Sequence, residues 1–392
     1  MQEESIVLLT LGSFQITAYS ALMAGAGLLA ILLTLIVGKK RIGADHALSV
    51  GLCGLLGAVI GGHLVYCLTN IGSVLADYES GIALLWRLNL GGYTLYGAIL
   101  GGIAAICLYG LITRQELLPL LDAAAPGTLL AVAIGRGAEY FTNQGLGEWL
   151  DEEVEALLRF PFAVAIRYDE DYVEWRVPVF VYEAAAALII LLALLLLLRK
   201  KQVPGRIAGT ALTLLGLTQI FLEQLRQDDF IRFGFVRFSQ LAALATVLFV
   251  MCVRLYRSFR VGGWKPTLTL RSLLFLLGVG LTILVEFGLE KPQVMPYLRI
   301  CLLVTGAVLC CYMMDGASHD YRVDGKRYHI VLMALLSVLF MVLTVVTVIL
   351  LDRSLDWENQ LLLAVMAVSM IMMAFVTQHR TDEDRLNPEA QE

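Results

Sequence analysis

The feature that most constrains this chain is a succession of apolar runs, each long enough to cross a bilayer. A hydrocarbon core of about 30 Å requires about 20 predominantly apolar residues in one helix. Windows of this kind begin near residues 15, 47, 93, 119, 179, 207, 238, 268, 295, 329 and 358. Hydrophobic residues make up 58% of the 392 and charged residues 16%, an apolar surplus typical of lipid-embedded chains. The sequence therefore predicts an all-α polytopic membrane protein with about eleven transmembrane helices.

The basic residues predict how the chain is oriented. Most lysines and arginines fall in loops on one side if the N-terminus is placed outside, and the positive-inside rule assigns that side to the cytoplasm. We therefore expect an N-terminus outside and a cytoplasmic C-terminus. The strongly acidic segment 143–178 then lies outside. It is predicted to form a small periplasmic head, with a short helix, a strand at Ala163–Tyr168 and a turn at Asp169–Asp171. A plain solvated loop is the alternative interpretation.

A break in composition divides the chain. Gly262, Gly263 and Pro266 follow a basic loop and precede a new set of apolar runs, which predicts a domain boundary. The predicted parts are a seven-helix transmembrane core (1–261), a four-helix transmembrane extension (262–380) and a cytoplasmic tail (381–392).

Charge and cysteine content exclude some functions. A net charge of −5, with no basic stripe, does not fit a nucleic-acid partner. The seven cysteines lie inside apolar stretches without metal-ligand spacing, so neither a metal nor a cofactor is predicted.

Charged residues inside predicted spans are candidates for function, because they are costly to bury in lipid. Arg136 and Glu139 are three residues apart on one helix, so they form either an internal ion pair or a functional pair. Glu223 and Arg226 repeat this spacing near a helix end, where they are either functional or a snorkelling anchor. Gln219 lies one turn before Glu223 on the same face and can hydrogen-bond a phosphate or a carbonyl.

Glycines gather at several points of the predicted core. Such residues let the backbones of two membrane helices approach closely, and we expect them to serve helix packing. They are Gly61, Gly62, Gly91, Gly92, Gly97, Gly101, Gly102, Gly135 and Gly137.

Eight motifs, in order between about Gly12 and Arg257, share the spacing of one known family. They are Ile16–Ser20, Gly61–Tyr66, Gly91–Gly97, Asp122–Pro126, Gly135–Arg136, Pro178–Glu183, Gln219–Asp228 and Gln240. Together they resemble the prolipoprotein diacylglyceryl transferase family of the bacterial cytoplasmic (inner) membrane. The resemblance implies transfer of a diacylglyceryl group from phosphatidylglycerol to the lipobox cysteine thiol of preprolipoproteins, with release of glycerol phosphate.

The resemblance also implies which residues form the site. The implied catalytic positions are Arg136, Tyr96, Glu139 and Gln219. The implied substrate-binding positions are Tyr19, His63, Asn143, Tyr182, Glu223, Arg226 and Gln240.

Several of these positions depart from the family pattern. Tyr96 stands where the family has histidine, Gln219 and His63 where it has arginine, and Glu139 where it has asparagine. The reaction needs a cation for the phosphate and a base for the thiol, and the usual base is missing. Glu139 either neutralises Arg136 or acts as the base, with Tyr96 and Gln219 as neutral donors. Two other functions stay open: a lipid-binding relative without catalysis, and an enzyme for another lipid or acceptor.

Overall fold

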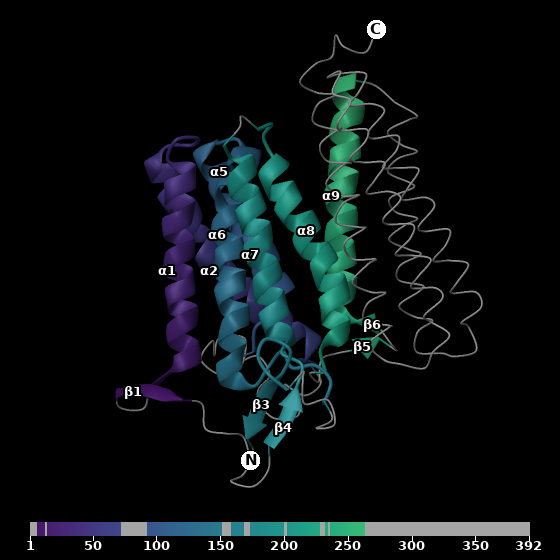
Figure 1. Cartoon of the computed structure of the whole chain (residues 1–392). Coiled ribbons are helices and arrows are strands. Elements are labelled where there is room, and N and C mark those ends of the chain that lie inside the picture. The colour runs from purple at the N-terminus through teal and green to yellow at the C-terminus, as the bar shows by residue number, and fades with distance from the viewer. Residues whose placement is uncertain are drawn as a thin grey trace, which may run out of the picture. The chain divides into compact units, whose positions relative to one another are not determined.

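The computed structural model describes most of the N-terminal two thirds of the chain (Figure 1). The described residues are 6–11, 14–71, 92–150, 158–167, 173–199, 202–227, 232–233 and 236–262. The predicted spans near 268, 295, 329 and 358, the extension 262–380 beyond its first residue, and the tail 381–392 lie outside them. The chain divides into two compact units, Met1–Leu244 and Ala245–Glu392, and the fold described below is that of the first.

The described residues are mostly helical, and the helices begin close to the predicted positions. They are α1 (Ala18–Gly38), α2 (Ala44–Thr69), α5 (Leu95–Thr113), α6 (Leu117–Ala138), α7 (Val179–Leu197), α8 (Arg206–Leu222) and α9 (Phe238–Gly262). Within the described residues, five segments are long and apolar enough to cross a membrane: α1, α2, α5, α7, and α6 with the turn after it, up to Thr142.

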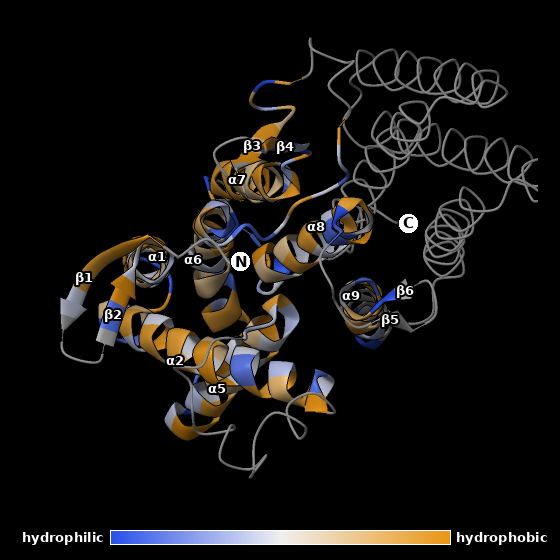
Figure 2. Cartoon of the chain, turned by 90° about the horizontal axis from the view of Figure 1, so that it is seen from below, coloured by the Kyte–Doolittle hydropathy of each residue, from blue (hydrophilic) through white to orange (hydrophobic). Residues whose placement is uncertain are grey.

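Helix α6 occupies the centre of the bundle. It contacts α1, α2, α5, α7 and α8, and the view along the helices shows it enclosed among them (Figure 2). A 3₁₀ turn, η2 (Glu139–Thr142), continues α6 and ends at Asn143. A second such turn, η4 (Glu223–Leu225), continues α8. Both turns and the start of α7 lie at the same end of the bundle, which we call the site end (Figure 1).

Glycines bring α2 and α5 into backbone contact, as predicted. A Cβ atom on Gly101 would lie 2.1 Å from the carbonyl oxygen of Gly57, and one on Gly97 would lie 2.6 Å from that of Gly61. No side chain larger than hydrogen fits at either position. The prediction is wrong for Gly137, because a Cβ there would meet nothing within 4 Å.

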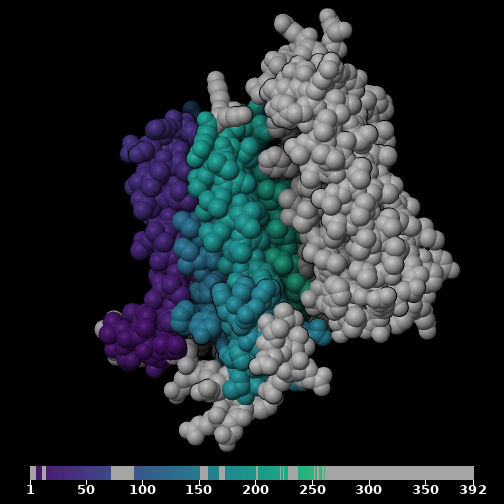
Figure 3. Space-filling model, viewed as in Figure 1, coloured from purple at the N-terminus to yellow at the C-terminus, as the bar shows by residue number. Residues whose placement is uncertain are grey.

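In the part of the chain that the structure describes, three short antiparallel hairpins add to the helices, a departure from the all-α prediction. They pair β1 (Val7–Leu11) with β2 (Phe14–Thr17), β3 (Val164–Arg167) with β4 (Val173–Arg176), and β5 (Arg232–Phe233) with β6 (Val236–Arg237). The first extends sideways from the foot of α1 (Figure 3). The second confirms the strand predicted at Ala163–Tyr168, while the predicted short helix at 151–157 and the turn at Asp169–Asp171 fall outside the described residues.

Candidate active site

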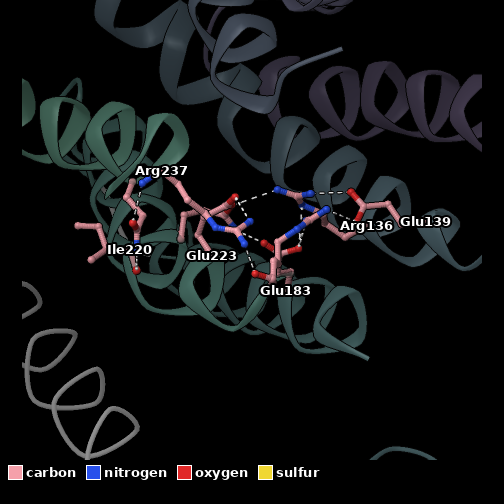
Figure 4. Close-up of polar contacts among 9 residues, drawn as sticks. Arg136, Glu139, Glu183, Ile220, Glu223 and Arg237 are labelled. Carbon is pink, nitrogen blue, oxygen red and sulfur yellow. Dashed lines mark hydrogen bonds and ion pairs between the residues drawn. The ribbon is translucent and has the colours of Figure 1, made fainter. Parts of the chain in front are cut away.

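Charged side chains from three helices converge at the site end of the bundle. Arg136 lies in the last turn of α6, Glu139 opens η2, and Glu183 lies in the second turn of α7. Gln219 lies in the last turn of α8, and Arg226 follows η4. The helices meet there because α6 and α8 end where α7 begins (Figure 1). The side chains of Arg136, Glu139 and Glu183 point toward one another at this place (Figure 4).

Glu183 is the centre of this cluster. Its Oε2 lies 2.7 Å from Nη1 of Arg226 and 3.3 Å from Nε of Arg136. Its Oε1 accepts a hydrogen bond of 3.0 Å from the amide nitrogen of Gln219. The Glu183 side chain is 0% exposed. A fully buried carboxylate requires such partners, because an unpaired charge in a low-dielectric interior is strongly destabilising.

Glu139 bridges the same two arginines from the more exposed side. Its Oε1 lies 2.5 Å from Nη1 of Arg136, and its Oε2 lies 3.1 Å from Nη2 of Arg226. Its side chain is 11% exposed. The predicted internal ion pair of Arg136 and Glu139 is therefore confirmed, but it belongs to a larger network. Two guanidinium groups sharing one carboxylate form a site whose geometry suits a two-oxygen anion.

Gln219 links α8 to α6 within the cluster. Its side-chain oxygen accepts a hydrogen bond of 3.1 Å from Nη2 of Arg136, while its amide group donates to Glu183. The residue is 1% exposed. A neutral amide can satisfy a cation and an anion at once, and so it holds both without adding a charge.

A third arginine extends the network toward α9. Arg237 lies 3.6 Å from the Glu223 carboxylate and donates to the backbone carbonyl of Arg226. Gln240 accepts a hydrogen bond from the backbone N–H of Arg237 and donates to the carbonyl of Ile220. Glu223 and Arg226 are 5% and 8% exposed. The alternative of a snorkelling anchor is therefore wrong for this pair, since both side chains point into the protein.

Tyr96 contributes a buried hydroxyl to the same region. The side chain is 5% exposed, and its hydroxyl has no hydrogen-bond partner among the residues that the structure describes. It is close enough to Glu223, Arg136 and Glu183 to interact with their charges. A buried hydroxyl normally finds a partner, so Tyr96 is available to a bound molecule.

A glycine-containing loop closes the cluster. Gly145 has a φ of +69°, which favours glycine, and a Cβ there would lie 2.4 Å from Oε2 of Glu139. The Gly145 carbonyl accepts a 2.9 Å hydrogen bond from the backbone N–H of Phe180, and that of Leu146 accepts one of 2.8 Å from Gln227. The loop thus ties the start of α7 to the chain after η4.

Comparison with known proteins identifies the family. The model of a family described as prolipoprotein diacylglyceryl transferase matches residues 6–256, well over half of the chain. The chain belongs to the prolipoprotein diacylglyceryl transferase family. The match covers the described helices α1 to α8, most of α9 and all residues of the cluster.

Relatives with this activity in their names occur in clostridia. A phosphatidylglycerol–prolipoprotein diacylglyceryl transferase of Clostridium kluyveri is 26% identical over 242 residues, which cover 61% of this chain and 91% of the relative. The protein of the same name from Clostridium tetani is 26% identical over 244 residues, covering 62% and 93%. One from Clostridium botulinum is 25% identical over 240 residues, covering 60% and 91%.

Most positions that the family resemblance selected lie in the cluster. Arg136, Glu139, Gln219, Glu223, Arg226 and Gln240 are joined by the contacts above, and Tyr96 borders them. Tyr19 lies in the first turn of α1 and is close enough to Glu139 and Arg136 to interact electrostatically with both. This arrangement agrees with the family assignment.

The remaining selected positions are His63, Tyr182 and Asn143. His63 is fully buried between the Gly92 carbonyl, 3.2 Å from Nδ1, and the thiol of Cys67, 3.5 Å from Nε2. The Tyr182 hydroxyl donates to the carbonyl of Pro161. Asn143 ends η2 with a φ of +51° and is exposed.

Asp122, part of a family motif, has a structural position that fixes α8. Its two carboxylate oxygens accept hydrogen bonds from the backbone N–H groups of Gly205, at 2.7 Å, and Ala208, at 2.8 Å. These are N–H groups that a helix N-terminus leaves without partners in its own chain. Asp122 of α6 thus caps α8 from a neighbouring helix.

Sequence reasoning missed two members of the cluster, Glu183 and Arg237. Glu183 is the last residue of the motif Pro178–Glu183, but it is not among the site positions that the resemblance implies. The signal was present, because a glutamate inside the apolar run of α7 meets the same criterion that singled out Arg136. Arg237 had no such signal, since it precedes α9 and is indistinguishable in sequence from an exposed loop arginine.

Proposed function

We propose that this protein transfers the diacylglyceryl group of phosphatidylglycerol to the lipobox cysteine thiol of prolipoproteins, in the bacterial inner membrane. The observation that carries the proposal is the pair of buried arginines, Arg136 and Arg226, held side by side by Glu139. The named activity of the clostridial relatives supports the choice of substrates. A phosphodiester carries two non-bridging oxygens, and it fits between two guanidinium groups as a carboxylate does.

The lipid phosphate takes the place of Glu139 rather than of Glu183. Glu139 is the partner on the more exposed side, with 11% of its side chain exposed against 0% for Glu183. Glu183 stays behind the arginines and keeps them aligned. The two guanidinium groups then stabilise the charge that gathers on the phosphate as the carbon–oxygen bond breaks.

Glu139, once displaced, accepts the thiol proton. The thiolate sulfur attacks the glyceryl carbon that carries the phosphate, a carbon–sulfur bond forms, and the carbon–oxygen bond to phosphate breaks. Glycerol phosphate leaves, and the proton on Glu139 is released with it. Tyr96 and Gln219 act as neutral hydrogen-bond donors to the lipid headgroup, a role for which the unpartnered Tyr96 hydroxyl is suited.

The proposed topology places this chemistry outside the cytoplasm. With the N-terminus outside, α1 begins at the outer surface and the site end faces the periplasm, where a lipobox cysteine arrives. We keep the division into a core at 1–261 with a periplasmic head at 143–178, an extension at 262–380 that completes eleven spans, and a tail at 381–392.

One observation favours a second candidate, a lipid-binding relative without turnover. Glu139 and Glu183 together already neutralise Arg136 and Arg226. If Glu139 is not displaced, the site stays closed to a phosphate.

The experiment is a transfer assay in liposomes that contain phosphatidylglycerol, with a synthetic lipobox peptide and mass detection of the product. We expect transfer by the native protein, and none by Arg136→Ala. Arg176→Ala is the matched control, because Arg176 also forms an ion pair, with Glu174 at 2.9 Å, but in the β3–β4 hairpin. Equal loss in both variants would overturn the role of the arginine pair. No transfer by a folded native protein would exclude the transferase and leave the second candidate.

A further inference from the structure

A tight turn next to the start of α7 exposes two aromatic rings. The backbone N–H groups of Phe162 and Ala163 both donate to the carbonyl of Arg159, at 2.8 and 3.0 Å. Ala163 is buried, whereas Phe160 is 68% exposed and Phe162 47%. Two exposed phenylalanines on an ordered turn are unfavourable in water, because each ring presents a large apolar area.

The position of the turn along the bundle is fixed by Tyr182. Its hydroxyl donates a 3.3 Å hydrogen bond to the carbonyl of Pro161, which lies between the two phenylalanines. Tyr182 is in the first turn of α7, and α7 is one of the segments long and apolar enough to cross a membrane. The turn therefore lies at the level where this span begins, which is the boundary between lipid headgroups and acyl chains.

The aromatic turn continues an apolar stripe of α7. Positions three and four residues apart from Tyr182 onward share one helix face. Their side chains are exposed and apolar: Ala185, Ile189, Leu192 and Leu196. Such a stripe on a span faces acyl chains. Phe160 and Phe162 extend it past the beginning of the helix.

Arg159 adds a positive charge to the same turn. The residue is exposed and directly precedes Phe160. Aromatic rings beside a basic side chain are the residue types found where a protein meets the lipid headgroups, since the rings enter the apolar layer and the cation meets the phosphates.

We propose that the turn Arg159–Phe162 is a membrane anchor, in which Phe160 and Phe162 insert between lipids at the site end and Arg159 contacts an anionic phosphate. The anchor acts on the candidate site through α7, because Tyr182 holds the turn and the next residue, Glu183, holds Arg136 and Arg226. It thus sets the depth of the arginine pair relative to the lipid phosphates.

Photo-crosslinking tests the anchor without any measurement of transfer. A negative result for the anchor is therefore distinguishable from a negative result for the proposed activity. The photoreactive residue p-benzoylphenylalanine replaces Phe160 in the full-length protein, in vesicles of phosphatidylglycerol and phosphatidylcholine. Leu192, on the stripe, is the positive control, and the exposed Glu148 is the control in water. We expect phospholipid adducts at 160 and 192 and none at 148, by mass spectrometry of the peptides.

A phospholipid adduct at position 192 without one at position 160 would overturn the proposal. A photoreactive residue at 160 that crosslinks only to protein, and not to phospholipid, would also overturn it. The second variant carries Arg159→Gln together with the photoreactive residue at 160. We expect about fivefold less phosphatidylglycerol adduct, the effect of one basic side chain at an anionic surface. An unchanged ratio of phosphatidylglycerol to phosphatidylcholine adducts would overturn the proposed contact between Arg159 and the phosphate.

Discussion

Helices associate in two different ways in the two halves of this bundle. Between α2 and α5, glycines such as Gly61 and Gly101 let backbone meet backbone. Between α6, α7 and α8, the site end is joined by arginines and glutamates, with Glu183 in the middle. The first contact depends on shape and the second on charge.

The difference shows where a ligand can enter. A backbone contact between glycines offers nothing that another molecule can replace. An ion pair can be replaced, because a second anion can take the place of a carboxylate on an arginine. The charged contact therefore combines support of the fold with a capacity to bind, whereas the glycine contact supports the fold alone. Substitutions in both regions test this division.

The largest effect is expected from Gly101→Leu. The new side chain would collide with the backbone of Gly57 and Gly61, so α2 and α5 cannot pack and little folded protein should be recovered. The measurement is the yield of monodisperse protein in detergent by size-exclusion chromatography. Gly25→Leu is the control, since a Cβ at Gly25 would meet nothing within 4 Å. A normal yield of Gly101→Leu would contradict the close approach.

Glu183→Ala should come next. It leaves Arg136 and Arg226 without their fully buried partner, and removal of one member of a buried pair costs about 3 to 5 kcal/mol. We expect a large drop in the thermal unfolding temperature, measured in detergent. Glu174→Ala removes the partner of Arg176 in the hairpin and should have a small effect. Equal drops would mean that burial of the network does not matter for stability.

Glu139→Gln distinguishes the contribution of Glu139 to stability from its contribution to the rate of transfer. Glutamine keeps the shape and one acceptor oxygen, so the unfolding temperature should change little, because Glu183 still holds both arginines. Transfer should fall by about 10²-fold or more, since glutamine cannot accept the thiol proton. The measurement is the rate of transfer in liposomes at saturating peptide. An unchanged rate would assign the base to another residue.

A moderate effect is expected from Asp122→Asn. In the native protein, both carboxylate oxygens accept a hydrogen bond from a backbone N–H group. Asparagine has only one acceptor oxygen, so its amide group faces the second N–H and that hydrogen bond is lost, at a cost of about 1 to 3 kcal/mol. Both the unfolding temperature and transfer should fall, because α8 carries Gln219. Thr213→Val is the control on α8, as it removes a bond within the helix but none to α6. If both variants behave alike, the cap does not set the position of α8.

The smallest effect is expected from Gly137→Ala, one residue from Arg136. A Cβ there meets open space, and alanine is favoured over glycine inside a helix by about 0.5 to 1 kcal/mol. The unfolding temperature should stay the same or rise slightly, and transfer should continue. A clear loss of stability would show that this side of α6 packs more closely than the structure indicates.

Features with a regular local pattern could be predicted from the sequence. The start of each described helix follows from apolar length, and the role of Gly61 and Gly101 in helix packing follows from small residues on spans. Arg136 and Glu139 follow from their spacing on one helix. Arg237 could not be predicted, because its place depends on how far-separated segments meet. The same holds for Tyr182, whose ring turns to Pro161 although its neighbour Glu183 faces the cluster.

Helices α6 and α8 are fastened to each other at two points with equal spacing along both. Asp122 binds Gly205, and Arg136 binds Gln219, and each pair is separated by 83 residues. The two fastenings lie 14 residues, or about 21 Å, apart along each helix. Two contacts at different heights of the helix pair prevent one helix from sliding along the other. Any opening that admits a lipid tail is therefore expected away from the contact of α6 with α8.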